Sequence, residues 1–298
     1  MSGPALLSEE SPPTLRRGGF LLGLSLIMMP LGGLISAVLA YLLFTAGLPP
    51  SILWRIILGA GAVPAAIVIL LRSKLPESSR WLSRGGAPGR RRMPFNEVWR
   101  GGYWRMLIYS SAAWVGGAGT TSIFTIFTPM LVAIRGGGGY GNMLGTVLLL
   151  WAFAALGAVF GSLMLDRVGR RILLMASLLG LGLVFWYVAA TYKTPGLEYS
   201  LSLAMLLTFL VVSGAYTVQT EVFPVEVKSF ADGIAFSLNR IANFVFGALT
   251  PIFLYTGSIM QYLGWVGAFV LLMSAIALPT GIETARRDLE EIERIARK

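Results

Sequence analysis

The chain has 298 residues, of which 55% are hydrophobic and only 13% are charged, and its formal net charge is +10. A soluble domain of this length does not use so much apolar surface, whereas a helix bundle solvated by lipid does. The sequence has no cysteine and no histidine. That composition excludes disulfides, thiolate nucleophiles, histidine-ligated metals and imidazole-based pH switches.

Eight apolar stretches are each long enough to cross about 30 Å of hydrocarbon as a helix of roughly 20 residues. In chain order they cover residues 20–44, 52–71, 106–133, 142–165, 172–191, 199–219, 233–256 and 262–281. The sequence therefore predicts an all-α, polytopic membrane helix bundle. With these boundaries every carboxylate, Asp232 included, falls in or beside a loop. We therefore expect these 298 residues to supply no mid-helix acid for proton transfer.

The basic residues are distributed unevenly over the expected loops. Arginine and lysine precede the first span, fill the loop between the second and third, and follow the fourth, sixth and last spans. The loops on the other side hold only Arg135 and Lys193. The positive-inside rule then predicts a multi-pass protein of the cell membrane with both termini cytoplasmic. Because topology accounts for the positive charge, nucleic acid is not an expected partner.

One long loop, residues 73–105, separates a pair of expected helices from a block of six. After the last span, residues 282–298 repeat apolar positions at helical spacing and pair Glu283 with Arg287 four residues later. This tail is predicted to be an amphipathic helix on the cytoplasmic side.

A distinctive motif follows the fourth span, at residues 161–171 (Gly-Ser-Leu-Met-Leu-Asp-Arg-Val-Gly-Arg-Arg). Gly169 permits a tight turn, so Asp166 at the end of one helix can pair with Arg170 at the start of the next. The motif resembles the signature cytoplasmic loop of the major facilitator superfamily.

Three further loops are similar to loops of sugar-porter-like members of that superfamily. Residues 76–82, Pro-Glu-Ser-Ser-Arg-Trp-Leu, resemble the motif after their sixth helix. Residues 221–228, Glu-Val-Phe-Pro-Val-Glu-Val-Lys, resemble the motif after their tenth, with Lys228 in place of arginine. Residues 9–18 resemble the loop between their fourth and fifth helices. The chain thus resembles a sugar porter or metabolite:proton symporter that lacks the first four transmembrane helices.

The resemblance implies a division of the chain. Residues 1–72 would hold family helices 5 and 6, residues 73–105 the inter-domain loop, residues 106–281 the C-terminal six-helix half, and residues 282–298 the cytoplasmic tail. It also implies secondary active or facilitative transport of a sugar, an organic acid or a similar small solute by alternating access. No enzymatic chemistry, cofactor or metal is implied.

The expected partners are the lipid bilayer and a small-molecule solute, and a second polypeptide could carry the missing four helices. An incomplete chain could also be a gene fragment or have a misplaced start. The alternative function is that of a non-transporting fragment or a subunit of a split transporter.

From the resemblance we expect a cytoplasmic network of charges that holds the two halves of the transporter together. Its members would be Glu9, Arg16, Glu77, Arg80, Asp166, Arg167, Gly169, Arg170, Glu221, Lys228 and Arg240. Arg240 lies inside the seventh span, where a central arginine costs roughly 2.5–3.5 kcal/mol. It could pair with Asp232 or Glu221 in a gate, or it could bind an anionic solute.

Candidate solute-lining residues lie in the third, sixth and seventh spans. They are Trp114, Thr120, Thr121, Thr125, Tyr216, Gln219, Asn239 and Asn243. The two asparagines, four residues apart, share one helix face and could line a cavity or bond to neighbouring helices. Threonine hydroxyls at such positions often bond to their own helix instead. The third span has Gly-Gly-Ala-Gly at residues 116–119 and not the paired glutamine of sugar porters, so the solute class stays open.

Overall fold

The computed structural model describes residues 18–72, 102–136, 139–223 and 225–284, and these residues form helices joined by short turns. The membrane-length elements are α2 (Gly18–Thr45), α3 (Pro50–Arg72), α8 (Tyr140–Val168), α9 (Arg170–Ala190), α10 (Leu197–Val222), α11 (Val225–Tyr255) and α12 (Ile259–Thr280). The remaining span consists of α6 (Trp104–Gly116), η1 (Ala118–Thr120), η2 (Ile123–Phe127) and α7 (Thr128–Gly136). Among the described residues no strand occurs, which confirms the all-α prediction.

Eight helical spans within the described residues are long and apolar enough to cross a membrane, as the sequence predicts. The third span differs from the prediction of one continuous helix. The α-helix ends at Gly116, a 3-10 turn and a π-helical turn follow, and the α-helix resumes as α7. The glycine-rich segment 116–119 explains this interruption, because glycine disfavours a regular helix interior. We call residues 117–127 the α6 break.

Two boundaries differ from the prediction in ways that affect function. Helix α11 begins at Val225 and not near residue 233, so Asp232 lies two turns inside the helix and within a membrane-length span. The prediction that Asp232 falls in or beside a loop is therefore wrong. After α12, residues 281–284 are not helical, although the tail pattern predicts a helix from Ile282. Residues 285–298 of that tail lie outside the described residues.

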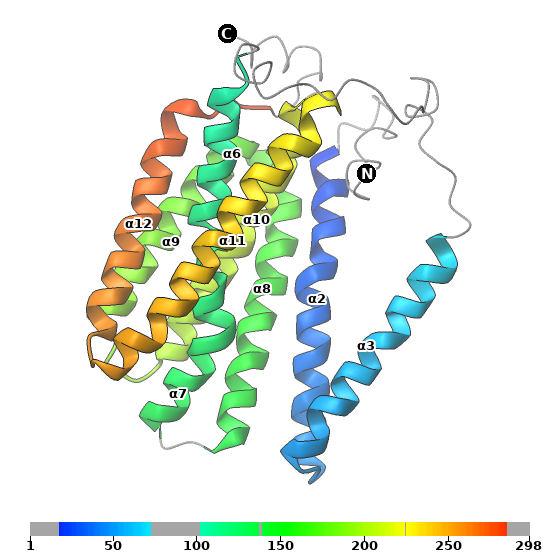
Figure 1. The fold of residues 1–298 in the computed structure, drawn as a ribbon, viewed down its shortest axis with the longest axis vertical. Helices are drawn as coiled ribbons and strands as arrows, with labels where there is room; N and C mark the ends of the chain where they lie inside the picture. The colour runs from blue at the N-terminus through cyan, green and yellow to red at the C-terminus, as the bar shows by residue number, and fades with distance from the viewer. Residues whose placement is uncertain (1–17, 73–101, 137–138, 224, 285–298) are drawn as a thin grey trace.

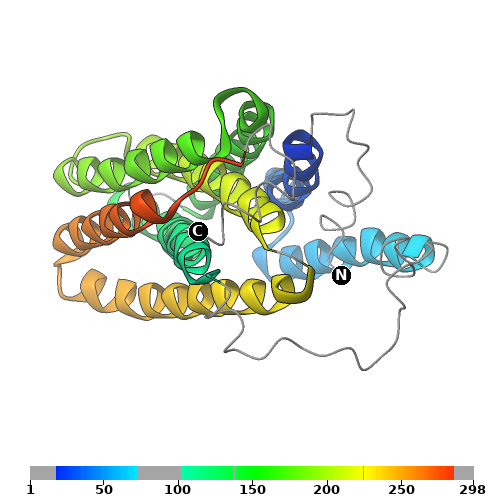
Figure 2. The ribbon, with the colours of Figure 1, turned by 90° about the horizontal axis from the view of Figure 1, so that it is seen from above.

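The helices alternate in direction, and several of their ends meet at one end of the bundle (Figure 1). Helices α8 and α10 end there, α9 and α11 begin there, and α12 ends there. We call this the Arg170 end. Viewed from above, α6 lies among α10, α11 and α12, and α2 lies beside α8 (Figure 2).

Small residues let the helices approach closely. A Cβ added at Gly157 of α8 would lie 2.3 Å from the carbonyl oxygen of Leu206 in α10, so only glycine fits this crossing. The most deeply buried of the described membrane spans is α10, which packs on α6, α8 and α9. In lipid, such backbone contact replaces the hydrophobic driving force that packs helices in water.

Helix α3 is a contrast to this packed core. Among its residues with described side chains, only Leu53 is buried, at 1% exposure, and long apolar side chains such as Leu58 and Ile69 are exposed. Figure 1 shows that α3 diverges from the bundle toward the C-terminal end of the helix. An apolar helix exposed on nearly all sides is suited to contact with lipid or with further membrane helices.

Candidate functional site

The buried side chain of Arg170 is the centre of a charge cluster where three helices meet. Arg170 begins α9, immediately after the turn at Gly169. One terminal nitrogen of its guanidinium lies 3.0 Å from Oδ1 of Asp166 in α8 and 3.0 Å from Oε1 of Glu221 in α10. The arginine is only 5% exposed, so this ion pairing takes place largely without water. Two carboxylates around one buried cation hold the ends of α8, α9 and α10 together.

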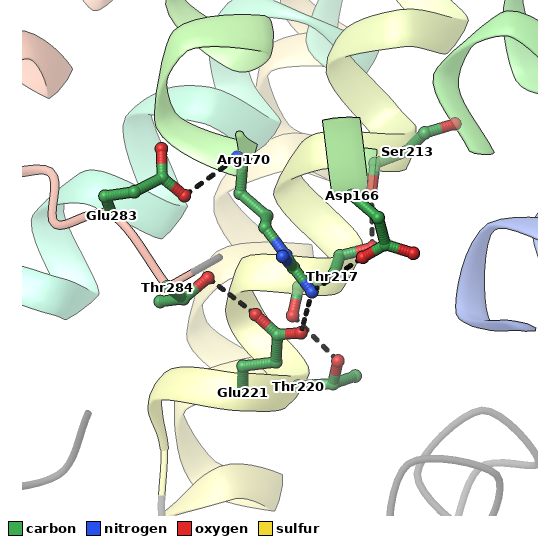
Figure 3. Close-up of polar contacts among 8 residues, drawn as sticks. All are labelled: Asp166, Arg170, Ser213, Thr217, Thr220, Glu221, Glu283 and Thr284. Atoms are coloured by element: carbon green, nitrogen blue, oxygen red, sulfur yellow. Dashed lines mark hydrogen bonds and ion pairs between the residues drawn. The ribbon is translucent and has the colours of Figure 1, made fainter. Parts of the chain in front are cut away.

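Two residues after α12 complete the cluster (Figure 3). The carboxylate of Glu283 accepts hydrogen bonds from the backbone N–H groups of Arg170 at 2.9 Å and Arg171 at 3.1 Å. The hydroxyl of Thr284 donates to Oε2 of Glu221 at 2.5 Å. A carboxylate at a helix N-terminus satisfies backbone donors that lack partners within the helix and complements the helix dipole. We call Asp166, Arg170, Glu221, Glu283 and Thr284 the Arg170 cluster.

Gly169 is required by the geometry of this cluster. Its φ of +105° and ψ of +147° lie in a region that is almost exclusive to glycine. A Cβ at this position would also lie 2.6 Å from Oε2 of Glu283. The turn therefore needs glycine both for its backbone conformation and for the room that Glu283 occupies.

Other residues expected in the charge network lie apart from this cluster. The buried amine of Lys228 donates to the carbonyl of Thr220 at 2.9 Å. Arg167 is exposed. Arg240 is also exposed, and its position twelve residues after Lys228 places it about 18 Å further along α11 at 1.5 Å per residue. The remaining expected members, Glu9, Arg16, Glu77 and Arg80, lie outside the described residues.

A second polar cluster holds the α6 break. The amide nitrogen of Asn243 in α11 donates to the carbonyl of Ala118 at 2.7 Å, and its Oδ1 accepts from the backbone N–H of Ser122 at 3.0 Å. One turn earlier, Asn239 donates to the carbonyl of Trp114 at 2.9 Å. These side chains replace backbone hydrogen bonds that the interrupted helix cannot make. Both asparagines, expected either to line a cavity or to bond to a neighbouring helix, make the second kind of contact.

The indole of Trp114, just before the break, is fixed from several sides. Its Nε1 donates to Oε1 of Gln219 in α10 at 2.5 Å. Its ring centroid lies 4.5 Å from that of Phe236 in α11 and 6.0 Å from that of Tyr216 in α10. The indole thus connects α6, α10 and α11 at the position where α6 ends.

The threonine candidates bond to their own backbone. The hydroxyl of Thr120 donates to the carbonyl of Gly117 at 2.9 Å, that of Thr121 to Ala118 at 2.6 Å, and that of Thr125 to Thr121 at 3.0 Å. Side-chain bonds of this type provide local partners where helical geometry changes. A role in contacting solute stays a prediction for all three.

Sequence reasoning missed Glu283 and Thr284, and it placed Asp232, named as a possible partner of Arg240, beside a loop. The first two were assigned to a tail helix because Glu283 stands four residues before Arg287, and nothing in the local pattern indicates a contact 113 residues away. The early start of α11 had a usable signal. Pro224 precedes Val225, and proline is favoured at the start of a helix.

Comparison with known proteins adds a family and a fold to this geometry. Residues 2–88 and 83–296 match the family model described as "Sugar (and other) transporter". The Escherichia coli protein YaaU, named for metabolite transport, is 26% identical over 259 residues, which cover 76% of this chain and 57% of that protein. Plastidic glucose transporter 4 of Arabidopsis thaliana is 25% identical over 335 residues, covering 97% of this chain and 59% of that protein.

Among solved structures, the proton:xylose symporter XylE of the major facilitator superfamily, bound to 6-bromo-6-deoxy-D-glucose, superposes with a TM-score of 0.78 at 17% identity. That match covers 98% of this chain and 70% of XylE. The chain spans less than 60% of the length of both sequence relatives.

Proposed function

Because the chain belongs to the sugar (and other) transporter family of the major facilitator superfamily, we propose that it takes part in moving a small solute across a membrane by alternating access. This family consists of transporters and not of enzymes. The observation that supports the proposal best is the Arg170 cluster. It joins the ends of α8, α9 and α10 and the residues after α12 through ion pairs and hydrogen bonds. Ion pairs and hydrogen bonds of this kind can break and re-form as the helix ends move during a transport cycle.

The cluster would act as a gate at the cytoplasmic face of a cell membrane. In this arrangement the Arg170 end faces the cytoplasm, as the distribution of basic residues predicts. Arg167, Lys228 and the four expected residues outside the described part of the chain would add the contacts to the other half of the transporter. Formation of the cluster would favour the state closed to the cytoplasm, and its loss would favour the opposite state.

We further propose a division of the chain in family terms. Residues 1–72 would supply family helices 5 and 6, residues 73–105 the inter-domain loop, residues 106–281 the C-terminal half, and residues 282–298 the cytoplasmic tail. The contact of α2 with α8 supports this division, because it places the first helix pair beside the block of six. Solute would then pass along α6, α10 and α11, facing helices that these 298 residues do not include.

The solute class that the residues favour is an organic anion. Arg240 is exposed within the α11 span and directly follows Asn239, which secures the α6 break. Its position about 18 Å along α11 from Lys228 favours a solute contact over a gate contact. A planar guanidinium is well suited to binding a carboxylate. A sugar, the other candidate, would have no need of a charge at this position.

The size of the native protein decides how transport should be assayed. An antibody against residues 286–298 would detect the protein in membranes of the source cells. A band near 32.1 kDa would direct the assay to this chain with and without a co-purifying membrane polypeptide. A band larger by about four spans of roughly 20 residues would direct it to the longer chain.

The assay itself is solute counterflow in proteoliposomes with a panel of organic acids and sugars. We expect counterflow of an organic acid, and we expect Arg240→Gln to abolish it. Counterflow of a sugar that survives Arg240→Gln would overturn the solute class. Absence of counterflow for every solute, with folded protein and every co-purifying polypeptide present, would favour the alternative function of a non-transporting fragment or subunit.

A further inference from the structure

A half-buried acid inside the α11 span has no place in the gate or at the α6 break. Asp232 lies two turns into the helix, and its Oδ1 is shielded from solvent without a hydrogen-bond partner. An ionisable side chain within a membrane span is costly, most of all at the centre. An ionisable residue at such a position therefore indicates a functional role, and its neighbours indicate which role that is.

The immediate surroundings of Asp232 contain one charge and one amide. Lys228, one turn earlier on α11, acts on the carboxylate electrostatically, and the side chain of Gln219 on α10 lies near it. Lys228 is also anchored to the carbonyl of Thr220 at 2.9 Å. The ammonium group of Lys228 therefore acts on Asp232 while it is also hydrogen-bonded to the backbone of α10.

Ionisable groups on the other helices packed against α11 either make other contacts or are exposed. On α10, Glu221 binds Arg170. On α6, Arg105 is exposed and Tyr109 lies near Glu283 and Arg171. The α12 span carries only Tyr262, which bonds to Thr250. Lys228 is thus the charged neighbour, and Gln219 the polar one, that set the state of Asp232.

The amide of Gln219 connects Asp232 to the α6 break. Its Oε1 accepts the indole N–H of Trp114 at 2.5 Å, and its Nε2 is buried without a hydrogen-bond partner. The carbonyl of Trp114 in turn accepts from Asn239, one of the two asparagines that hold the break. Gln219 on α10 therefore lies between the acid on α11 and the residue near which α6 ends.

We propose that Asp232 takes up and releases one proton in each transport cycle, and that Gln219 and Trp114 transmit its change of charge to the α6 break. The inference rests on the proposed transport function and names its coupling ion. The proton comes from water on one side, forms an O–H bond with the carboxylate, and returns to water on the other side. No electrons move, and no other reactant is needed.

The chemistry of the amide explains the transmission. While Asp232 is ionised, it can accept a hydrogen bond from Nε2 of Gln219, and Lys228 offsets its charge. Once Asp232 is protonated, its O–H becomes a donor and competes with the indole of Trp114 for Oε1 of Gln219. The contact that fixes Trp114 therefore differs between the two protonation states.

The first test is to separate solute exchange from proton-driven accumulation in the complete transport-competent protein. With one proton per solute and no membrane potential, a gradient of one pH unit supports accumulation up to about tenfold. We expect Asp232→Asn, a neutral isostere, to keep counterflow and to lose accumulation above the external concentration. Glu198→Gln, at the opposite end of the bundle, is the matched control and should accumulate normally. Accumulation by Asp232→Asn equal to wild type would overturn the proposal.

A second test does not depend on transport. The fluorescence of Trp114, taken as the difference between the purified chain and its Trp114→Phe variant, should change with pH. The change should vanish in Asp232→Asn, shift its midpoint in Asp232→Glu and persist in Glu198→Gln. A pH-independent signal in folded wild-type protein overturns the proton site. A titrating Trp114 in a protein without any counterflow would keep the proton site and reject coupled transport, which distinguishes the two failures.

Discussion

Glu283 caps the first turn of α9 from 113 residues further along the chain, through its hydrogen bond to the backbone N–H of Arg170 at 2.9 Å. The same arginine binds Asp166 and Glu221 with its side chain. Arg170 is thus held at both its backbone and its guanidinium. A movement of any of these helix ends must therefore change the contacts of Arg170.

Replacing the buried cation should cost far more than replacing its exposed neighbour. Arg170→Gln leaves two buried carboxylates without their counter-charge, so we expect the free energy of unfolding to fall by about 3–5 kcal/mol. Arg167→Gln removes the same charge from the exposed surface of the same turn and should change it by less than about 0.5 kcal/mol. Thermal or denaturant unfolding of the purified chain in detergent measures both. Equal effects would contradict the central role of Arg170.

Neutralising one carboxylate should affect transport more than folding. Asp166→Asn keeps the shape of the side chain but weakens its 3.0 Å contact with Arg170, while Glu221 remains. We expect solute uptake by the complete protein to be impaired, with little loss of membrane expression. Uptake per molecule, with expression measured by immunoblot, checks this prediction. Uptake equal to wild type would remove Asp166 from the gate.

The residues after α12 should contribute through two separable interactions. Thr284→Val is nearly isosteric and removes the hydrogen bond to Glu221, which should cost about 1.5–3 kcal/mol because the acceptor is charged. Glu283→Ala removes the cap of α9 and should cost about 0.5–2 kcal/mol, whereas Glu283→Gln retains one acceptor oxygen and should cost less. Unfolding curves that rank alanine and glutamine equally would show that the cap does not stabilise α9.

Gly169 should not tolerate a side chain. Gly169→Ala places a Cβ against Glu283 at a backbone conformation of φ +105°, and the backbone strain alone should cost about 1–3 kcal/mol. Gly145→Ala in α8 is the matched control, because no atom lies within 4 Å of its added Cβ. The control should unfold like wild type or slightly later. A Gly169→Ala variant with an unchanged midpoint would mean that the turn can adopt another conformation.

Asn243 should be essential for the α6 break. Asn243→Leu leaves the carbonyl of Ala118 and the N–H of Ser122, both partly buried, without their partners, and the two together should cost about 1–3 kcal/mol. The adjacent Phe244 is 75% exposed, so Phe244→Leu should be neutral in the same unfolding measurement. Hydrogen exchange at residues 117–122 should also increase in Asn243→Leu alone. Unchanged protection there would mean that the backbone finds other partners.

The eight spans could be predicted from sequence because lipid demands about 20 apolar residues for each, and Asp166 and Arg170 could be brought together because they flank one turn. The α6 break was not predicted although the glycine-rich segment 116–119 was a local signal for it, because the bonds that hold it come from Asn239 and Asn243 on a helix that is distant in sequence. Asp232 was placed beside a loop because hydropathy alone does not reveal the two polar turns with which α11 begins. Local periodicity likewise gave no sign that Glu283 leaves the helix pattern to cap α9.

The dependence of the α6 break on Asn243 also imposes an order on the biogenesis of the protein. Ala118 and Asn243 are separated by 125 residues, so α6 emerges from the ribosome long before its partner exists. Unsatisfied backbone groups cost several kcal/mol each in hydrocarbon. The segment therefore either inserts as an unbroken helix that is remodelled later or waits at the translocation site for α11. In both cases the interruption forms late, after most of the chain has been synthesised.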